Sequence, residues 1–387
     1  MRAVIIGAGI AGLTAAKGLR LLGWEVEIYE QAPELKALGA GLSLSANALR
    51  ALRVLGLYDA VIADAQPIDR LDLLNRQGAV LQTTDFAQFS ARYGHLSMVV
   101  LHRGALQRAL LSELSVPIHT GMECVTACED EKRVVLTFAG GETVEAEFVL
   151  ACDGIHSAVR KSLFPDSREH FAKYTCWRAI SSGLPRGLSP TRLTETWDAG
   201  KRLGLAAIPG EQVYWFACCN ADAIADPALS HIGVSELQAM FSDFHDPVPE
   251  VLGKTPPDSL IWTDILDIDP LPSFTRGRVV LLGDAAHAVT PDLGQGAGLA
   301  IEDAAVLAAL LGNHPVNDAL REYDARRVGR AHKIAAASRL YAKVAQWHNP
   351  LIVPIRNVLV RSIPERFMDR QLDAVLDIAF EPVKAAA

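Results

Sequence analysis

The first residues with a chemical pattern are the glycines of the sequence GAGIAG, which are Gly7, Gly9 and Gly12. They follow the apolar run of residues 3–6 and precede leucines and alanines at helical spacing, which predicts a strand, a tight turn and a helix. In this arrangement the first glycine allows the turn, the second lets the backbone approach a pyrophosphate, and the third lets the helix pack on the strand. Free N–H groups at the start of the helix favour negative charge. The spacing therefore predicts a dinucleotide site.

Glu30 is the acidic residue expected for the same site. Gly23 is placed to end the helix, and residues 25–29 have the pattern of a second strand that leads to Glu30. An acid about 20 residues after the glycines accepts hydrogen bonds from a ribose. These residues alone do not decide between NAD and FAD.

Asp153 and Gly154 begin a second motif, DGIHSAVR, directly after the strand-like run of residues 146–152. An acid and a glycine at the end of a buried strand can contact a phosphate or a ribose. Ser157 and Arg160 lie on one side of the helical turn that is expected to follow. By itself, a DG pair indicates only a turn.

The third motif, GDAAHAVTPDLGQGAG, is the most specific. Residues 278–282 are expected to form a buried strand, Gly283 and Asp284 stand at its carboxyl end, and a long helix is expected from about 296 to 311. The segment of residues 290–298 contains a proline and three glycines, so few side chains cover its backbone. Its N–H groups can face an electron-rich ring edge, which gains negative charge when a flavin is reduced.

With these three motifs in order, the chain resembles the FAD-dependent aromatic hydroxylases, which are single-component flavoprotein monooxygenases. The resemblance extends from Met1 to about Ala345. It implies that the glycine-rich turn holds the FAD pyrophosphate, that Glu30 binds the adenosine ribose and that Asp284 contacts the ribityl chain. The residues expected to bind FAD are Gly7, Gly9, Ile10, Ala11, Gly12, Glu30, Gly41, Arg103, Gln107, Asp153, Gly154, Arg160, Gly283, Asp284, Pro291, Gly294, Gln295, Gly296 and Ala297.

The resemblance implies a reaction as well as a cofactor. NADH or NADPH would reduce the bound FAD, O2 would add to the flavin at C4a, and the resulting hydroperoxide would pass one oxygen to an aromatic or heteroaromatic ring. The protein would position the cofactor and exclude water. Two alternatives stay open: an epoxidase or other alkene oxygenase, and a flavin-binding protein without monooxygenase activity. A halogenase is disfavoured because the chain has no WxWxIP string, and a disulfide reductase because no cysteine precedes Cys124.

Arg202, Tyr214 and Asp292 are the candidates for catalytic contact with the substrate. Electrophilic oxygen transfer is favoured when an ionised or hydrogen-bonded hydroxyl makes the ring electron-rich, so a cation, a phenol or a carboxylate over the flavin would each help. The bacterial FAD-linked urate hydroxylases resemble the chain at these three positions. The alternatives are a solvated strand-edge residue for Arg202 and a core phenol for Tyr214.

Three further residues have a chemical and a structural interpretation. His287 in GDAAH could be a base, but the preferred interpretation is that it braces the loop of residues 290–298. Trp177 and Arg178 could line the substrate cavity, although an aromatic residue in a strand more often belongs to the core.

The pattern of elements predicts an α/β chain, α+β overall, with a Rossmann-like FAD-binding domain interleaved with a mostly antiparallel β-sheet substrate domain. Residues 192–198, 201–208 and 212–219 alternate like strands, with Pro209 and Gly210 as a hairpin turn. The expected divisions are a discontinuous FAD-binding domain of residues 1–69, 97–172 and 272–345, a substrate-binding sheet domain of residues 70–96 and 173–271, and C-terminal helices in residues 346–387.

Composition places the chain among ordinary globular proteins. It has 387 residues, half of them hydrophobic, and a net charge of −8, with no Lys/Arg cluster that suggests a nucleic-acid-binding or anionic-membrane surface. Its six cysteines lack zinc-type spacing, so we expect no metal site and reduced thiols in a cytoplasmic protein. No apolar run predicts a transmembrane segment. The expected partners are O2 and a small aromatic or heteroaromatic substrate, with the chain a monomer or homodimer.

The stretch from Trp347 to Phe380 is rich in Leu, Ile, Val and Arg at helical spacing. It could form an amphipathic helix at a membrane surface or in a dimer. Because its basic residues are few, we prefer packing across the FAD-binding domain or the mouth of the substrate pocket.

Overall fold

The computed structural model describes residues 1–36, 39–130 and 133–384, and its central sheet carries the three motifs. The strands of this sheet are β1 (Arg2–Ile6), β2 (Glu25–Glu30), β8 (Ile118–Thr120), β12 (Phe148–Ala151), β18 (Thr275–Arg276) and β19 (Val279–Leu281). They lie in the order β18-β19-β12-β1-β2-β8, and β1 pairs in parallel with both β12 and β2. The middle strands are almost wholly apolar because both faces of the sheet are covered. The expected Rossmann-like arrangement is confirmed.

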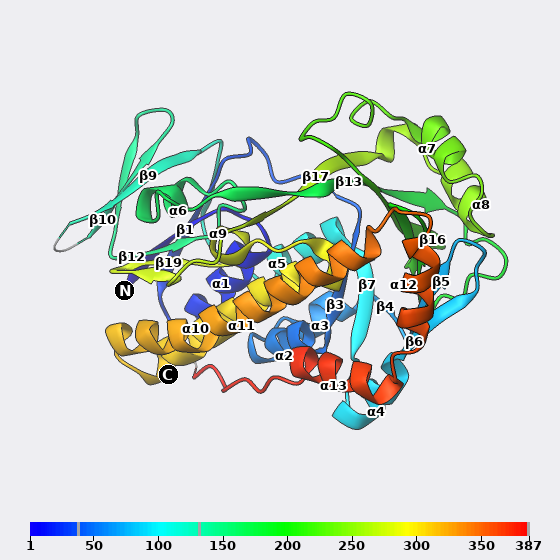
Figure 1. The fold of residues 1–387 in the computed structure, drawn as a ribbon. Coiled ribbons are helices and arrows are strands. Elements are labelled where there is room, and N and C mark those ends of the chain that lie inside the picture. The colour runs from blue at the N-terminus through cyan, green and yellow to red at the C-terminus, as the bar shows by residue number, and fades with distance from the viewer. Residues whose placement is uncertain (37–38, 131–132, 385–387) are drawn as a thin grey trace.

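Helices cover one face of this sheet, and a small antiparallel sheet covers the other (Figure 1). The helices are α1 (Ile10–Leu21), α10 (Gly296–Asn313) and α11 (Val316–Ala345). The small sheet consists of β9 (Cys124–Glu129), β10 (Val134–Phe138) and β11 (Thr143–Ala146), and α6 (Ala158–Leu163) packs on β9. Among the described residues, α10 alone is long and apolar enough to cross a membrane, but 72% of it is buried inside the protein, as is usual for a core helix.

A second large sheet has the strand order β17-β13-β16-β15-β14-β5-β6. Its strands are β5 (Arg70–Asn75), β6 (Val80–Asp85), β13 (Glu169–Ser182), β14 (Arg192–Trp197), β15 (Lys201–Ile208), β16 (Gln212–Asn220) and β17 (Ile261–Ile268). All neighbours are antiparallel except β14 and β5. Trp177 and Trp215 lie in a core that packs under α7 (Val234–Met240) and α8 (Val248–Gly253) on the outer face. The other face is turned toward the first sheet.

Short elements connect the two large sheets. The strands β3 (Gly41–Ser45), β4 (Gln66–Pro67) and β7 (Met98–His102) form a sheet in the order β3-β7-β4, with contacts from β3 to β13 and from β7 to β15. The remaining helices are α2 (Ala46–Val54), α3 (Tyr58–Ile62), α4 (Phe86–Tyr93), α5 (Arg103–Ser112), α9 (Asp284–His287), α12 (Ile352–Arg361) and α13 (Glu365–Leu376), with 3-10 turns η1 (Pro257–Ser259) and η2 (Pro291–Leu293). After α11, α12 packs against β6 and α13 against α2.

Candidate active site

The turn after β1 presents bare backbone. Gly7 has φ +100°, and a Cβ there would overlap the carbonyl oxygen of Cys152. A Cβ on Gly12 would overlap the carbonyl oxygen of Gly7, so this glycine is needed for close packing of α1 on β1. A Cβ on Gly9 would meet no atom within 4 Å, and α1 begins at the next residue, Ile10. The open backbone and free helix N-terminus fit the pyrophosphate of FAD.

Glu30 is held in place beside this turn. Its Oε2 accepts a hydrogen bond from the Ala8 N–H at 2.7 Å, and its Oε1 accepts one from the Ala32 N–H at 2.9 Å. A carboxylate oxygen can accept a second hydrogen bond, so Glu30 can also bind a ribose hydroxyl.

The three motifs meet in space because they follow parallel strands that end at the same edge of the sheet. A Cβ on Gly7 would lie 3.3 Å from the backbone nitrogen of Asp153, and a Cβ on Gly283 would lie 3.0 Å from the Cβ of Ala11. Arg160 joins the second motif to the third, because its guanidinium donates to the carbonyl oxygens of Ile155 at 2.5 Å and Ala285 at 3.3 Å. The side chain of Arg160 is fully buried, and contact with FAD stays a prediction.

Asp153 shapes the turn that carries the second motif. Its Oδ1 accepts a hydrogen bond from the Ser157 hydroxyl at 2.6 Å, and its Oδ2 accepts one from the Val159 N–H at 3.2 Å. Gly154 follows with φ +78° and with no atom within 4 Å of the position of a Cβ. The backbone of Gly154 is therefore more open to a ligand than the carboxylate of Asp153.

Asp284 is exposed at the start of α9, between the buried residues Gly283 and Ala285. Desolvation by the protein around this position raises the pKa of Asp284, and the charges of His287, Arg103 and Arg160 oppose the rise. An accessible carboxylate surrounded by cationic groups fits a hydroxyl-rich ligand such as a ribityl chain.

Arg103 and Gln107 lie one turn apart on α5. The backbone of Gly39, with φ +119°, crosses the Arg103 side chain so closely that a Cβ would lie 2.9 Å from Cδ of Arg103. Arg103 is exposed and Gln107 is half-buried. Both side chains remain predicted FAD contacts.

The loop of residues 290–298, here called the flavin loop, packs against β3. Gly294 has φ +62°, and a Cβ there would lie 2.8 Å from the Ser43 hydroxyl. The loop passes through η2 and includes the first residues of α10, which begins at Gly296, and the side chain of Gln295 does not cap this helix. Its first N–H groups are therefore available to a flavin ring. The predicted residues Pro291, Gly294, Gln295, Gly296 and Ala297 all lie in this segment.

Behind the flavin loop, a buried carboxylate on α10 connects three elements. Asp303 Oδ2 accepts hydrogen bonds from His287 Nε2 at 2.6 Å and from the Gly283 N–H at 2.9 Å, and Oδ1 accepts one from Arg327 Nε at 2.7 Å. Burial alone would raise the pKa of Asp303, but the charges of His287 and Arg327 outweigh it and lower the pKa. His287 therefore braces the turn before the flavin loop, as preferred from the sequence.

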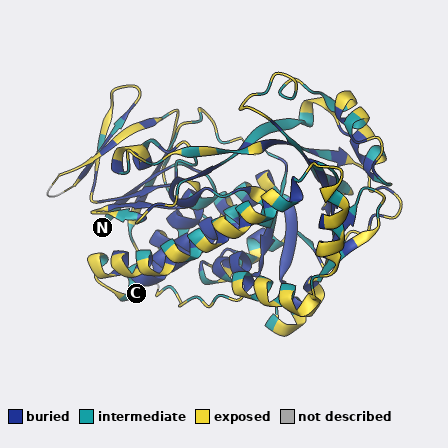
Figure 2. Cartoon of the chain, in the orientation of Figure 1, coloured by how far each residue is buried: buried dark blue, intermediate teal, exposed yellow. Residues whose placement is uncertain are grey.

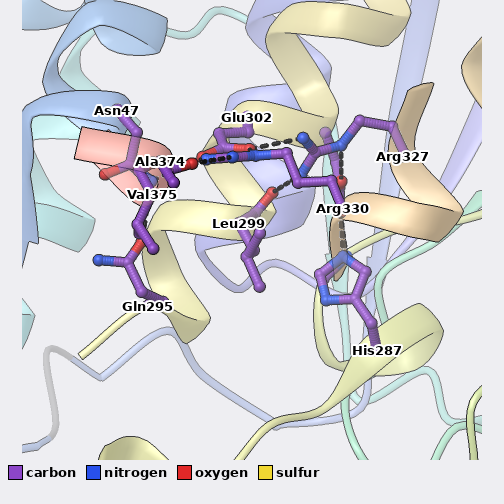
Figure 3. A network of polar contacts seen from close by, with 11 residues as sticks. Asn47, His287, Gln295, Leu299, Glu302, Arg327, Arg330, Ala374 and Val375 are labelled. Carbon is purple, nitrogen blue, oxygen red and sulfur yellow. Dashed lines mark hydrogen bonds and ion pairs between the residues drawn. The ribbon is translucent and has the colours of Figure 1, made fainter. Parts of the chain in front are cut away.

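Glu302, the preceding residue, extends this network (Figure 3). Its carboxylate accepts hydrogen bonds from Arg327 at 2.5 Å, from Arg330 at 2.6 and 2.7 Å and from Asn47 at 2.6 Å. Asn47 also donates to Oε1 of Gln295 at 2.9 Å. The start of α10 is thus connected through Asn47 and Glu302 to α2 and α11.

The structure brings two of the three predicted catalytic residues into direct contact. Arg202, only 2% exposed, forms ion pairs with Asp292 and with Glu195, the latter at 3.1 Å. Asp292 lies in the flavin loop, and its Oδ2 accepts a hydrogen bond from the Tyr174 hydroxyl at 2.8 Å. Arg202 is therefore a buried residue between the second sheet and the flavin loop, not a solvated edge residue.

Tyr214 lies farther along the same face. It stands four residues before Cys218, which is the cross-strand neighbour of Arg202. The Tyr214 ring packs on the backbone of Gly41, where a Cβ would overlap it. Burial raises the pKa of Tyr214, and the charge of Arg178 opposes the rise. Tyr214 thus lies against the strand that leads into the flavin site.

Tyr174 and Glu195 were not predicted from the sequence. Trp177 and Arg178 were grouped as possible cavity residues, but these two neighbours lie on opposite faces of β13. Trp177 is fully buried in the outer core, whereas Arg178 donates to the Thr263 hydroxyl at 2.8 Å on the inner face. Period-two alternation was the available signal, because Tyr174 and Arg178 share a face and Trp177 must point away.

Comparison with known proteins agrees with this geometry. A family model described as "FAD binding domain" matches residues 1–338. The chain is 34% identical to the aurachin C monooxygenase/isomerase of Stigmatella aurantiaca, with 95% of each chain covered. It is 31% identical to the 2-heptyl-3-hydroxy-4(1H)-quinolone synthase of Pseudomonas aeruginosa strain UCBPP-PA14, with 94% of each covered. The crystal structure of Klebsiella pneumoniae HpxO complexed with FAD and uric acid superposes with a TM-score of 0.87 at 28% identity, with 97% of each chain covered.

Proposed function

The chain belongs to the family of FAD-dependent aromatic hydroxylases and is an FAD-dependent monooxygenase, and from this premise we propose that its substrate is an uncharged nitrogen heterocycle with a ring N–H and a carbonyl group on the ring. A 2-alkyl-4(1H)-quinolone is the first candidate. The name of one relative includes such a quinolone, and uric acid, bound in the structural relative, is also a nitrogen heterocycle.

The observation that carries this proposal is the pairing of Arg202 with two carboxylates. Because Glu195 and Asp292 both contact its guanidinium, Arg202 is not a free cation for a substrate carboxylate. Burial raises the pKa of Glu195, while Arg202 opposes the rise. The surface formed by Arg202, Glu195 and Asp292 therefore favours a substrate group that is neutral and donates a hydrogen bond. Arg178, on the same face, can donate to the carbonyl oxygen of such a ring.

The residues of the chain would prepare the ring for oxygen transfer. When bound, FAD supplies the redox chemistry, in which NADH or NADPH is oxidised and O2 is activated. We propose that Asp292 Oδ2, which already accepts a hydrogen bond from the Tyr174 hydroxyl, also accepts the ring N–H proton. Loss of the N–H proton leaves an electron pair that is delocalised over the ring, so the conjugated ring carbons become more nucleophilic. The buried setting of Arg202 keeps Asp292 in a fixed orientation and limits access of water.

The test compares ring compounds in parallel. FAD-loaded protein is mixed with NADH or NADPH in air with catalase present, and with 2-heptyl-4(1H)-quinolone, urate, 6-hydroxynicotinate or 4-hydroxybenzoate. We expect the quinolone to accelerate NAD(P)H oxidation and to gain one oxygen atom by mass spectrometry. Stimulation by the two carboxylated compounds only would contradict the proposal.

We also propose a cytoplasmic location. The support is that all six cysteines are free thiols, which is usual in a reducing compartment. Labelling of intact and permeabilised cells with a membrane-impermeant reagent that reacts with surface amines tests this: modification in intact cells would contradict it.

A further inference from the structure

The helix α12 shows the reverse of the usual amphipathic arrangement. Its outward face carries Ile355, Val358 and Leu359, which are 58%, 63% and 58% exposed, and Leu351 just before it is 79% exposed. Its inward face carries Arg356, which is 1% exposed. Figure 2 shows the long exposed surface of this helix at the side of the molecule. We call Leu351, Ile355, Val358 and Leu359 the aliphatic face.

Contacts on the inward side fix the orientation of α12. Arg356 donates to the carbonyl oxygens of Ala345 at 2.9 Å and Asp198 at 3.3 Å, and its guanidinium lies 5.2 Å from the centre of the Trp197 ring. Val360 belongs to the same buried cluster as Trp197. Rotating the helix to bury the aliphatic face would break these polar contacts, so the exposure of this face is built into the fold.

The sequence that leads into α12 is basic, unlike the chain as a whole. The protein has a net charge of −8, yet residues 325–364 contain no Asp or Glu and include eight Lys or Arg residues, four of which on α11 pair with acids outside this range. Of the others, Lys343 precedes α12 and Arg361 ends it, and both are exposed. Within the described part of the chain, neither forms an ion pair. Beyond residue 364, acidic and basic residues alternate along α13.

We propose that α12 docks on an anionic lipid surface. The aliphatic face can enter the boundary between headgroups and acyl chains, while Lys343 and Arg361 contact lipid phosphates. A second copy of the chain fits less well, because a two-fold contact through α12 would bring the exposed basic residues Lys343 and Arg361 of both copies together. One helix face is also small beside the roughly 800 Å² per partner that a stable dimer buries.

This surface adjoins a large cleft that reaches the flavin loop. The cleft has a volume of about 1150 Å³ and is lined by Lys343, Gln346 and His348 near α12, and by Thr290 at the start of the flavin loop. A docked helix would place the cleft at the lipid surface, from which an alkylated heterocycle could enter. This entry route rests on the proposed function, whereas docking of α12 does not.

The experiment measures co-sedimentation of the FAD-loaded protein with vesicles. The vesicles are either pure phosphatidylcholine or an equal mixture of phosphatidylcholine and phosphatidylglycerol. We expect binding to the mixed vesicles, weakened by salt, and a fall of about tenfold or more in the partition coefficient of the double variant Ile355→Asp/Leu359→Asp. The control Val125→Asp changes an exposed aliphatic residue on β9, at the other end of the molecule (Figure 1), and is expected to bind normally.

Three results would overturn the proposal. The first is no binding of the unmodified protein to either vesicle, and the second is equal loss of binding in the control. The third is a dimer in solution that the double variant separates, with no lipid binding, because the occupant would then be a second copy. Bound FAD and NAD(P)H oxidation are measured on every variant, so misfolding is recognised, and a failed substrate assay leaves the vesicle result standing.

Discussion

At the residue scale, the position of Asp292 between Arg202 and Tyr174 gives one side chain two duties. It holds the flavin loop against the second sheet, and we propose that it also accepts a proton from the substrate. Arg202 retains Glu195 as a partner if the charge of Asp292 is removed. The proposed catalytic role of Asp292 can therefore be tested separately from its structural role.

We expect Asp292→Asn to retain FAD and the fold but to lose ring hydroxylation by roughly 10²–10⁴-fold, because an amide cannot accept the ring proton. The measurement is kcat for product formation, beside the flavin content. Tyr174→Phe, which keeps the carboxylate, serves as the matched control with a smaller loss. Turnover of Asp292→Asn at the rate of the unmodified protein would show that this carboxylate is not the proton acceptor.

Gly9 and Gly12 of the first turn allow the effect of a substitution on FAD binding to be separated from its effect on stability. We expect Gly12→Ala to lower the free energy of unfolding of the FAD-free protein, because its Cβ would overlap the Gly7 carbonyl. Gly9→Ala is expected to leave that free energy within about 1 kcal/mol but to weaken FAD binding, because its Cβ would occupy the open space that is predicted to hold the pyrophosphate. Urea unfolding and FAD titration check both. A Gly9→Ala variant that binds FAD normally would place the pyrophosphate elsewhere.

At the element scale, α10 is the helix that links the flavin site to the rest of the protein. Glu302 and Asp303 connect it to α11 through Arg327, and Arg330 on α11 donates to Glu302 at 2.6 Å and to the carbonyl oxygen of Val375 on α13 at 2.7 Å. The C-terminal helix is thus connected to the start of α10 through Arg330, Glu302 and Asn47 (Figure 3).

The buried network around Asp303 predicts that a single substitution there strongly lowers the stability of the protein. Asp303→Asn removes a charge that pairs with Arg327 and His287, and breaking a buried pair of this kind costs about 3–5 kcal/mol. We expect a lower free energy of unfolding and easier loss of FAD, measured by denaturation and by flavin release on dilution. Asp318→Asn, in an exposed pair with Arg321 on α11, is the control and is expected to change stability by less than about 0.5 kcal/mol.

The elements were easier to predict than the contacts between them. The sequence predicted the three motifs and the strands β14, β15 and β16, because each depends on local spacing and alternation. The contact of Arg202 with Asp292 joins positions 90 residues apart, which no local pattern specifies. Adjacent acids such as Glu302 and Asp303 are typical of a solvated helix face, and only the arginines of the next helix explain their burial.

At the scale of the whole molecule, the two large sheets share one chain that passes between them several times. β5 and β6 join the second sheet before β12 and β19 complete the first. The C-terminal segment then returns to both, because α12 packs on β6 and α13 on α2. The C-terminal stretch therefore lies over the second sheet as well as the FAD-binding region.

The strand order of the first sheet sets the timing of cofactor uptake during synthesis. The strand β1 emerges first from the ribosome, but β19 ends at Leu281, and the flavin loop follows it. At a synthesis rate of about 5–20 residues per second, roughly 15–55 s pass between the synthesis of β1 and that of β19, and the first sheet cannot be completed before then. We expect nascent chains stalled with β19 still inside the ribosome to retain no FAD, and chains that expose α10 to retain it. Flavin bound to the shorter chains would mean that the first turn captures FAD before its sheet exists.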